Sequence, residues 1–189
     1  MNITPEEAQA ALENIQQTTT KTRSIFNMWS YYLLVWGVVW TTGFLATQFE
    51  RQLSALIWIV MVTIGIVGSI MLGLSQARRM RLAPGSQAAI LGTRLGIFWG
   101  VLYGFAALWM SLFSLNSPQI AILWITVVMF GTIINGVWLQ QRLMIGFGIG
   151  VTLMSVLGYY LLPQYFYAWA AVFAGLPLAV LGIYLLRQR

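Results

Sequence analysis

Long runs of apolar residues, separated by short polar segments, are the dominant pattern along this chain. Six runs have the length needed to cross about 30 Å of hydrocarbon as an α-helix. They lie near residues 27–48, 53–74, 95–115, 120–139, 143–162 and 165–186. None of them contains Asp, Glu, Lys or Arg. The pattern therefore predicts an all-α membrane protein with six transmembrane helices over residues 25–189.

Most of the polar segments between these runs leave room only for a tight turn. They are centred on Glu50-Arg51, Asn116-Ser117-Pro118-Gln119, Gln140-Gln141-Arg142 and Pro163-Gln164. Because short connections join antiparallel neighbours, we expect three consecutive helical hairpins. The exception is the longer connection 75–94, whose centre Ala83-Pro84-Gly85-Ser86 is typical of a turn.

Basic residues concentrate on one predicted side of the membrane. That side receives Lys21, Arg23, Arg78, Arg79, Arg81, Arg94, Arg142, Arg187 and Arg189, and the other side receives Arg51. Loops rich in Lys and Arg stay in the cytoplasm. We therefore expect both termini, and the basic loop with Arg78, Arg79 and Arg81, to be cytoplasmic.

The composition supports lipid as the main solvent and narrows the chemistry. Hydrophobic residues make up 59% of the chain and charged residues 7%, whereas soluble domains carry about 25% charged residues. The basic residues lie at the ends of apolar runs and not on a folded polar face, which argues against nucleic-acid binding. Cys and His are absent, which removes disulfides, thiolate chemistry and the usual zinc sites. We expect no cofactor and no metal.

Catalysis is not expected either. No Asp, Glu, Lys or Arg lies inside a predicted span, so proton relays and carboxylate-coupled ion transport lack their usual residues. The remaining nucleophile candidates are Ser, Thr and Tyr, without a neighbouring base.

The first 24 residues differ from the rest and predict a short amphipathic helix. Thr4 is a candidate cap, Pro5 suits the first helical position, and Glu7 completes a capping box. Apolar residues then recur on one face at Ala8, Ala11, Leu12 and Ile15. This leader helix either binds a partner protein, a second copy of the chain or the basic loop, or it is simply solvated.

Short stretches of sequence recur along the chain and suggest related hairpins. The stretch from Ala55 through Trp58 to Gly65 matches the stretch from Ala121 through Trp124 to Gly131. Among the odd-numbered spans, Trp36-Gly37-Val38 matches Trp99-Gly100-Val101, and Phe147-Gly148 is a weaker third instance. All units would run in the same direction across the membrane, as parallel repeats. The alternative is convergence, because tryptophan belts and glycine contacts recur in any helical bundle.

Glycines provide the clearest candidates for helix packing, because small residues let transmembrane helices approach closely. The candidates are Gly65, Gly96, Gly100, Gly131 and Gly148. The Gly96-x-x-x-Gly100 spacing marks either a contact inside the chain or a dimer face, and we favour a contact inside the chain. Pro177 is expected to kink the sixth span and to free a carbonyl one turn earlier.

Asn135 is the most expensive polar side chain inside a span, since a carboxamide in hydrocarbon needs partners. It aligns with Ser69 in the repeat. The pair either contributes to a polar pocket or forms interhelical hydrogen bonds that set packing. The aromatic residues Trp36, Trp40, Trp99 and Tyr103 are candidates for lining the same cavity.

One resemblance rests on the first 50 residues. The leader Pro5-Glu6-Glu7-Ala8 with Ala11, Leu12 and Ile15, followed by the stretch from Trp36 to Phe44 (WGVVWTTGF), resembles uncharacterised bacterial multipass membrane proteins with an EA…AL…I leader and a WGxxWxxGF first span. The resemblance implies a bacterial cytoplasmic membrane and carries no activity with it.

Two functions are compatible with these observations. The favoured one is a non-catalytic accessory or scaffold subunit that acts through helix–helix contacts and the leader helix. The alternative is a binding protein or permease for an apolar or aromatic small molecule, held by Trp36, Trp40, Trp99, Tyr103, Asn135 and Ser69. The expected partners are the lipid bilayer and another membrane protein or a second copy of the chain.

Overall fold

The computed structural model describes residue 9, residues 30–80 and residues 87–187, and every regular element within them is helical. Six helices are long and apolar enough to cross a membrane. They are Ser30–Phe49, Arg51–Ser75, Gly92–Leu112, Ser117–Trp138, Arg142–Leu161 and Phe166–Arg187. Each overlaps one apolar run of the sequence to within a few residues. An all-α protein with six helices of membrane-spanning length is therefore confirmed. The leader helix lies outside the described residues.

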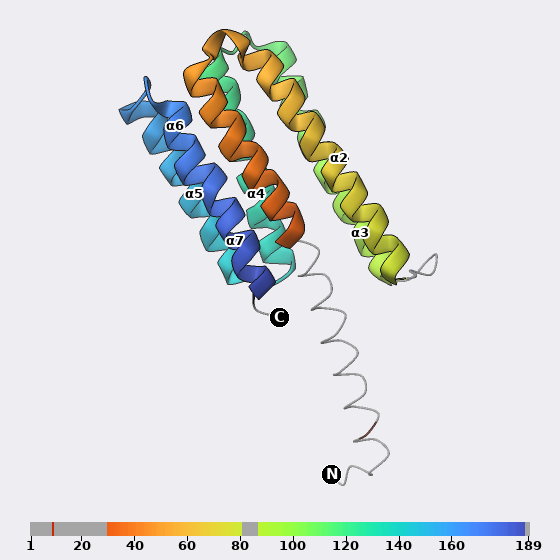
Figure 1. The fold of residues 1–189 in the computed structure, drawn as a ribbon. Helices are drawn as coiled ribbons and strands as arrows, with labels where there is room; N and C mark the ends of the chain where they lie inside the picture. Colours follow the sequence, from red (N-terminus) through yellow and green to blue (C-terminus); the bar gives the residue numbers. More distant parts are fainter. Residues whose placement is uncertain (1–8, 10–29, 81–86, 188–189) are drawn as a thin grey trace.

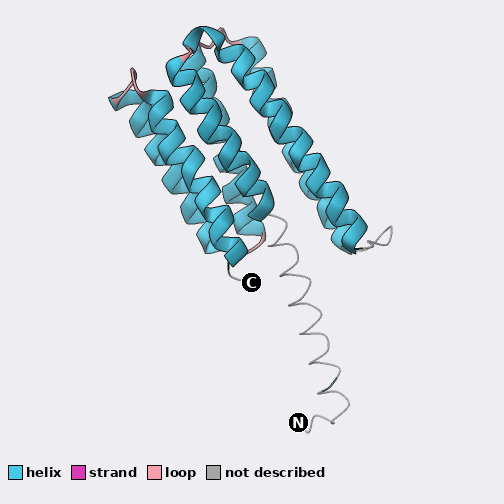
Figure 2. Ribbon diagram, viewed as in Figure 1, coloured by secondary structure: helices cyan, strands magenta, loops and turns pink. Residues whose placement is uncertain are grey.

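The first span, Ser30–Phe49, is orange and unlabelled in Figure 1. The elements after it are η1 (Arg51–Leu53), α2 (Ser54–Met80), α3 (Gln87–Leu112), α4 (Ser117–Trp138), α5 (Arg142–Leu161), α6 (Phe166–Ala170), η2 (Ala171–Gly175) and α7 (Leu176–Arg187). The last three form one continuous span. Figure 2 shows that the described loops are confined to the helix ends.

The beginning of α4 is determined locally by its capping residues. The Gln119 backbone N–H donates to Oδ1 of Asn116 at 3.0 Å, and the Asn116 N–H donates to Oε1 of Gln119 at 2.9 Å. This reciprocal pair satisfies N–H groups that have no partner inside the helix. Pro118 occupies the first turn, where its missing N–H costs nothing. The polar segment expected as a turn thus also starts the helix.

Helices α2 and α3 extend further than their apolar runs. α2 continues to Met80 and α3 begins at Gln87, so the connection expected over 75–94 shrinks to 81–86, outside the described residues. The sequence flanking the turn is rich in Arg, Gln, Ala and Leu, which favour helix. Residues that favour helix therefore extend α2 and α3 beyond the ends of their apolar runs.

The sixth span changes its hydrogen-bond register before Pro177. Residues Ala171–Gly175 form a π-helical segment, and the Leu176 N–H donates to the Ala171 carbonyl, five residues back. Pro177 has no N–H to continue the α-helical ladder, and a π-helical turn is one way in which a helix accommodates such an interruption. The expected irregularity at Pro177 is thus present, as a register change one turn before the proline.

The six spans are unequally packed. The buried share of the apolar window is 39% in the first span, 39% in α4, 28% in α5 and 39% in the span formed by α6, η2 and α7, but 6% in α2 and 6% in α3. Figure 1 shows both α2 and α3 on the same side of the other spans. We call the first span, α4, α5 and the sixth span the body of the protein.

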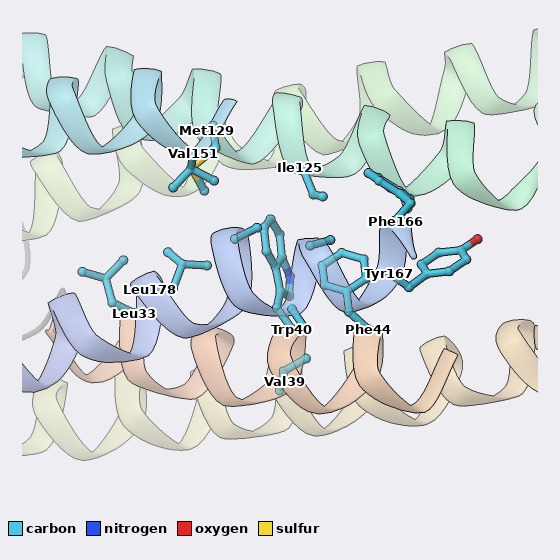
Figure 3. Close-up of a cluster of buried hydrophobic side chains, with 14 of the residues drawn as sticks. Leu33, Val39, Trp40, Phe44, Ile125, Met129, Val151, Phe166, Tyr167 and Leu178 are labelled. Carbon is cyan, nitrogen blue, oxygen red and sulfur yellow. The ribbon is translucent and has the colours of Figure 1, made fainter. Parts of the chain in front are cut away.

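The hydrophobic core lies inside this body (Figure 3). The first span contributes Leu33, Val39, Trp40 and Phe44, α4 contributes Ala121, Ile125 and Met129, α5 contributes Val151, and the sixth span contributes Phe166, Tyr167, Ala170, Ala171, Ala174, Leu178 and Leu181. Lipid tails are as apolar as these side chains. Close van der Waals packing, and not exclusion of water, therefore holds this core together.

Candidate functional site

A tryptophan of the first span lies over a glycine of α2. A Cβ atom at Gly65 would be 3.0 Å from Cη2 of Trp36. The Trp36 indole N–H donates to Oγ of Ser69 at 3.1 Å, and the Tyr32 hydroxyl donates to the Ser69 carbonyl oxygen at 3.2 Å. The structure thus brings together two of the predicted ligand-binding residues, Trp36 and Ser69, in a contact between helices.

The same contact recurs between α3 and α4. A Cβ atom at Gly131 would be 2.6 Å from Cη2 of Trp99. The Trp99 ring also lies 5.4 Å from that of Tyr103, which lies 5.8 Å from the Trp124 ring. Trp99 and Gly131 are the residues that the sequence match pairs with Trp36 and Gly65. The matched tryptophans and glycines therefore make equivalent contacts in the two pairs of helices.

Asn135 does not repeat the role of Ser69. Its side chain has no exposed surface, and neither Nδ2 nor Oδ1 has a hydrogen-bond partner. It follows Gly131 by one helical turn, so it lies close to the same face of α4. The interhelical hydrogen bond expected as one alternative is not formed. A buried, unpaired carboxamide is costly to the folded state.

Ser155 on α5 shares this property and was not selected from the sequence. It has no exposed surface, and its Oγ has no partner. Other hydroxyls inside the spans donate to their own helix, as Thr47 does to Gly43, Thr132 to Val128 and Thr152 to Gly148. The sequence does not indicate which hydroxyl will bond to its own helix and which will not, because this depends on the rotamer that packing imposes.

Trp40 and Tyr103 occupy different environments. Trp40 is 5% exposed and packs in the core, with its ring edge-on to Phe44 at 5.9 Å. Tyr103 is 37% exposed, on a helix with little burial. The four aromatic residues predicted to line one cavity thus divide into a core residue, a partly exposed residue packed between two tryptophans, and two residues that cover glycines.

Three of the predicted packing glycines do pack inside the chain. Gly65 and Gly131 lie under the two tryptophans, and a Cβ atom at Gly148 would be 2.6 Å from Cγ1 of Ile133 on α4. Cβ atoms essentially never approach a neighbour so closely, so a larger residue at Gly131 or Gly148 would push the helices apart.

The prediction that Gly96 and Gly100 pack inside the chain is wrong for the described residues. A Cβ atom at either position, or at Gly92 or Gly104, would meet no neighbouring atom within 4 Å. These four glycines recur every four residues and drift slowly around α3. Trp99 and Leu102 hold α4 on another side of the helix, so the glycine face of α3 (Gly92, Gly96, Gly100 and Gly104) points away from the described chain.

A close contact between helix backbones was not selected from the sequence. It joins the first span to the sixth span, where Gly37 meets the backbone of Ala179. A Cβ atom at Gly175 would be 2.6 Å from the Thr41 nitrogen, and one at Gly182 would be 2.8 Å from the Ser30 carbonyl oxygen. The small residues at 175, 179 and 182 have the spacing of one helix face. That spacing was the feature of the sequence from which this helix contact could have been predicted.

Gln48 is a second residue that the sequence did not single out. Its Nε2 donates to the Gln164 carbonyl oxygen at 3.0 Å, and its Oε1 accepts from the Ala168 N–H at 3.2 Å. Arg51 also donates to the Gln164 carbonyl. Tyr165, which precedes α6, makes no side-chain cap. Gln48 therefore caps α6 from another span.

The predicted basic loop is only partly described. Arg78 is exposed near the end of α2. The side chain of Arg79 and the whole of Arg81 lie outside the described residues.

No protein-family model matches the chain, and no curated protein or solved structure matches it at a significant level. Function is therefore argued from the chain's own residues.

Proposed function

We propose that this protein is a non-catalytic membrane subunit that binds another transmembrane helix through the glycine face of α3. The observation that carries the proposal is the contrast between glycines. Those of the first span, α2 and α4 are covered by neighbouring helices, whereas all four glycines of α3 face no described atom. Small residues favour close approach between helices and offer little to lipid chains. An uncovered face of this kind suits a helix that the described chain does not supply.

A native mass spectrum tests the proposal. The protein is expressed at low level in its own host and released into mild detergent or nanodiscs. We expect a species heavier than the 21.2 kDa chain, containing either a second copy or a second polypeptide. The double variant Gly96→Leu/Gly100→Leu should release the single chain, because the new side chains block close approach of the partner.

The chain offers a matched control on α5. Gly146 and Gly150 have the same spacing and also meet no neighbouring atom within 4 Å. Unlike α3, α5 also carries covered glycines, Gly148 and Gly158, and is held by neighbouring helices. If the partner binds the glycine face of α3, Gly146→Leu/Gly150→Leu should leave the complex intact. A single chain without a partner in the unmodified protein, or equal loss of the complex in both variants, would sink the proposal.

Asn135 supports a second candidate function, the binding of a small molecule. A carboxamide provides both a donor and an acceptor, and that of Asn135 has neither one engaged. In this reading the ligand pairs with the amide and packs against apolar side chains. Trp99, which covers the preceding turn of α4, is the nearest of the predicted aromatic residues along that face.

The variant Asn135→Leu separates this reading from a structural role. Removing an unpaired buried amide is expected to stabilise the protein by about 1 kcal/mol, measured by thermal unfolding in detergent. Under the binding reading, a discrete added mass of a few hundred daltons in the native spectrum also disappears. If Asn135→Leu is destabilising by a similar amount, the amide has a structural partner and the candidate falls.

We further propose a bacterial cytoplasmic membrane, with both termini, the leader helix and the basic loop in the cytoplasm. The distribution of Lys and Arg supports this orientation, and the resemblance of the leader and first span supports the compartment. Because the chain has no cysteine, single Cys variants at Ser86 and Gln52 can be labelled with an impermeant maleimide. In intact cells, Gln52→Cys should react and Ser86→Cys should not. The opposite labelling would reverse the orientation.

The hairpin arrangement is also proposed to be an internal repeat. The equivalent contacts Trp36–Gly65 and Trp99–Gly131 support a relationship between the first two hairpins. The third hairpin departs from them: Trp169 lies against Gly158, and Gly175 meets Thr41. The proposal predicts that exchanging the two tryptophan–glycine pairs for Phe–Ala has comparable effects on thermal stability. A large difference between them would argue for convergence.

A further inference from the structure

One end of the bundle carries exposed arginines without acidic neighbours in the described chain. Arg78 lies at the end of α2, Arg94 near the start of α3, Arg142 at the start of α5 and Arg187 at the end of α7. Figure 1 shows these helix ends on the same side of the molecule, which we call the basic end. Among the described residues the one carboxylate side chain is that of Glu50, next to Arg51 at the opposite end.

An exposed tryptophan connects the segments that carry Arg94 and Arg142. Trp138 is the last residue of α4 and is 58% exposed. Its ring lies 5.2 Å from that of Phe98, edge-on. Arg94 precedes Phe98 by one helical turn on the same face of α3. Arg142 follows Trp138 by four residues and begins α5, after a turn in which Gln140 adopts φ 54°.

The surface that continues from this point towards the membrane centre is apolar. On α3, Ile97 is 62% exposed and Val101 is 65% exposed, and both share a face with Arg94. On α4, Val137 and Phe130, seven residues apart, are likewise exposed. From the helix ends inward, the exposed residues are thus first charged, then aromatic and then aliphatic. An amphipathic molecule with an anionic head and long apolar chains matches this order.

We propose that Arg94, Trp138 and Arg142 bind the headgroup of an anionic phospholipid, whose chains lie along α3 and α4. The guanidinium groups match a phosphate through paired N–H donors. The indole places its ring at the boundary of the hydrocarbon and its N–H among the polar groups. The position at the ends of membrane-spanning helices, together with the uncompensated charge, favours a lipid of the surrounding bilayer over a soluble anion.

The test is native mass spectrometry of the full chain in mild detergent, with phosphatidylglycerol and phosphatidylcholine added in equal amounts. We expect one phosphatidylglycerol to be retained about tenfold more than phosphatidylcholine, given the attraction of each arginine for anionic headgroups. Arg94→Gln/Arg142→Gln should abolish this preference. Trp138→Phe should reduce the retained fraction, because the ring contact with Phe98 persists while the indole N–H is lost. Inorganic phosphate at millimolar concentration should not displace the lipid.

The control variant changes the same charge at the same end. Arg78→Gln/Arg187→Gln removes two exposed arginines on α2 and α7, outside the segment from α3 to α5 that carries the proposed site, and it should keep the preference. An equal loss in this control would assign the preference to net charge and overturn the site. So would an unchanged preference in Arg94→Gln/Arg142→Gln, displacement by inorganic phosphate, or equal retention of both lipids by the unmodified chain.

Discussion

The interface between the first span and the sixth span, and the glycine face of α3, use the same small residue in opposite ways. In the first, Gly37, Gly175 and Gly182 meet backbone atoms of the neighbouring helix, and both spans are 39% buried over their apolar windows. In the second, four glycines meet no described atom, and the window is 6% buried. The first interface is complete within the chain, whereas the second surface has no described counterpart.

The difference shows what a glycine spacing means in a membrane helix. Spacing of three or four residues aligns glycines on one face, but close packing also needs a neighbour with a complementary surface. Ala179 and Thr41 provide that surface opposite Gly37 and Gly175. No residue of the described chain provides such a surface opposite Gly100. The motif alone is therefore weak evidence for an internal contact.

The largest effect is expected when the same large side chain is inserted on both surfaces. Gly37→Leu should destabilise the protein by about 3 kcal/mol or prevent folding, because the new Cβ overlaps the backbone of Ala179. Gly104→Leu on α3 should not destabilise the protein, because leucine favours helix and the new Cβ meets no described atom there. Both are measured by thermal unfolding in detergent. Equal destabilisation would show that the α3 face is already covered.

A second prediction concerns the cap that Gln48 makes on α6, at the end of the body opposite the basic end. Gln48→Leu removes the donor to Gln164 and the acceptor from Ala168, and should destabilise the protein by about 1–2 kcal/mol. Gln52→Leu, four residues on and exposed, is the control and should have little effect. A neutral Gln48→Leu would mean that water replaces both hydrogen bonds without loss.

A third prediction concerns how α2 is held to the body. Ser69→Ala removes the acceptor for the Trp36 indole and should destabilise the protein by about 1 kcal/mol. Ser111→Ala, whose hydroxyl bonds to its own helix at Leu108, is the matched control and should be close to neutral. Unfolding in denaturing detergent, followed by tryptophan fluorescence, reports both. If the two variants behave alike, the hydrogen bond does not secure α2.

The smallest change in stability is expected on the glycine face of α3. Gly100→Ala should stabilise the isolated chain by about 0.5 kcal/mol, because alanine favours helix and meets no atom there. The same variant should weaken the proposed complex. A loss of stability in the isolated chain would instead reveal a close neighbour, which thermal unfolding of the detergent-dispersed protein detects.

Local patterns in the sequence were sufficient for the elements themselves. Six uncharged apolar runs predict six spans because a backbone in hydrocarbon must satisfy its hydrogen bonds internally, which a helix of about 20 residues does. Asn116 and Gln119 mark the beginning of α4, and Pro177 marks the irregular turn in the sixth span. The matched Trp36–Gly65 and Trp99–Gly131 pairs were also visible, since both members lie at corresponding positions of related stretches.

Which helix faces pack against each other became clear only from the tertiary structure. It placed Gly37 against Ala179 but left Gly96 and Gly100 open, it buried Trp40 but exposed Tyr103, and it paired Ser69 while leaving Asn135 without a partner. In a chain whose spans are all apolar, periodicity does not separate the face towards a helix from the face towards lipid. That choice depends on the shapes of neighbours brought together from distant parts of the chain, as with Gln48 and Ala168, and those shapes exist only once the bundle has formed.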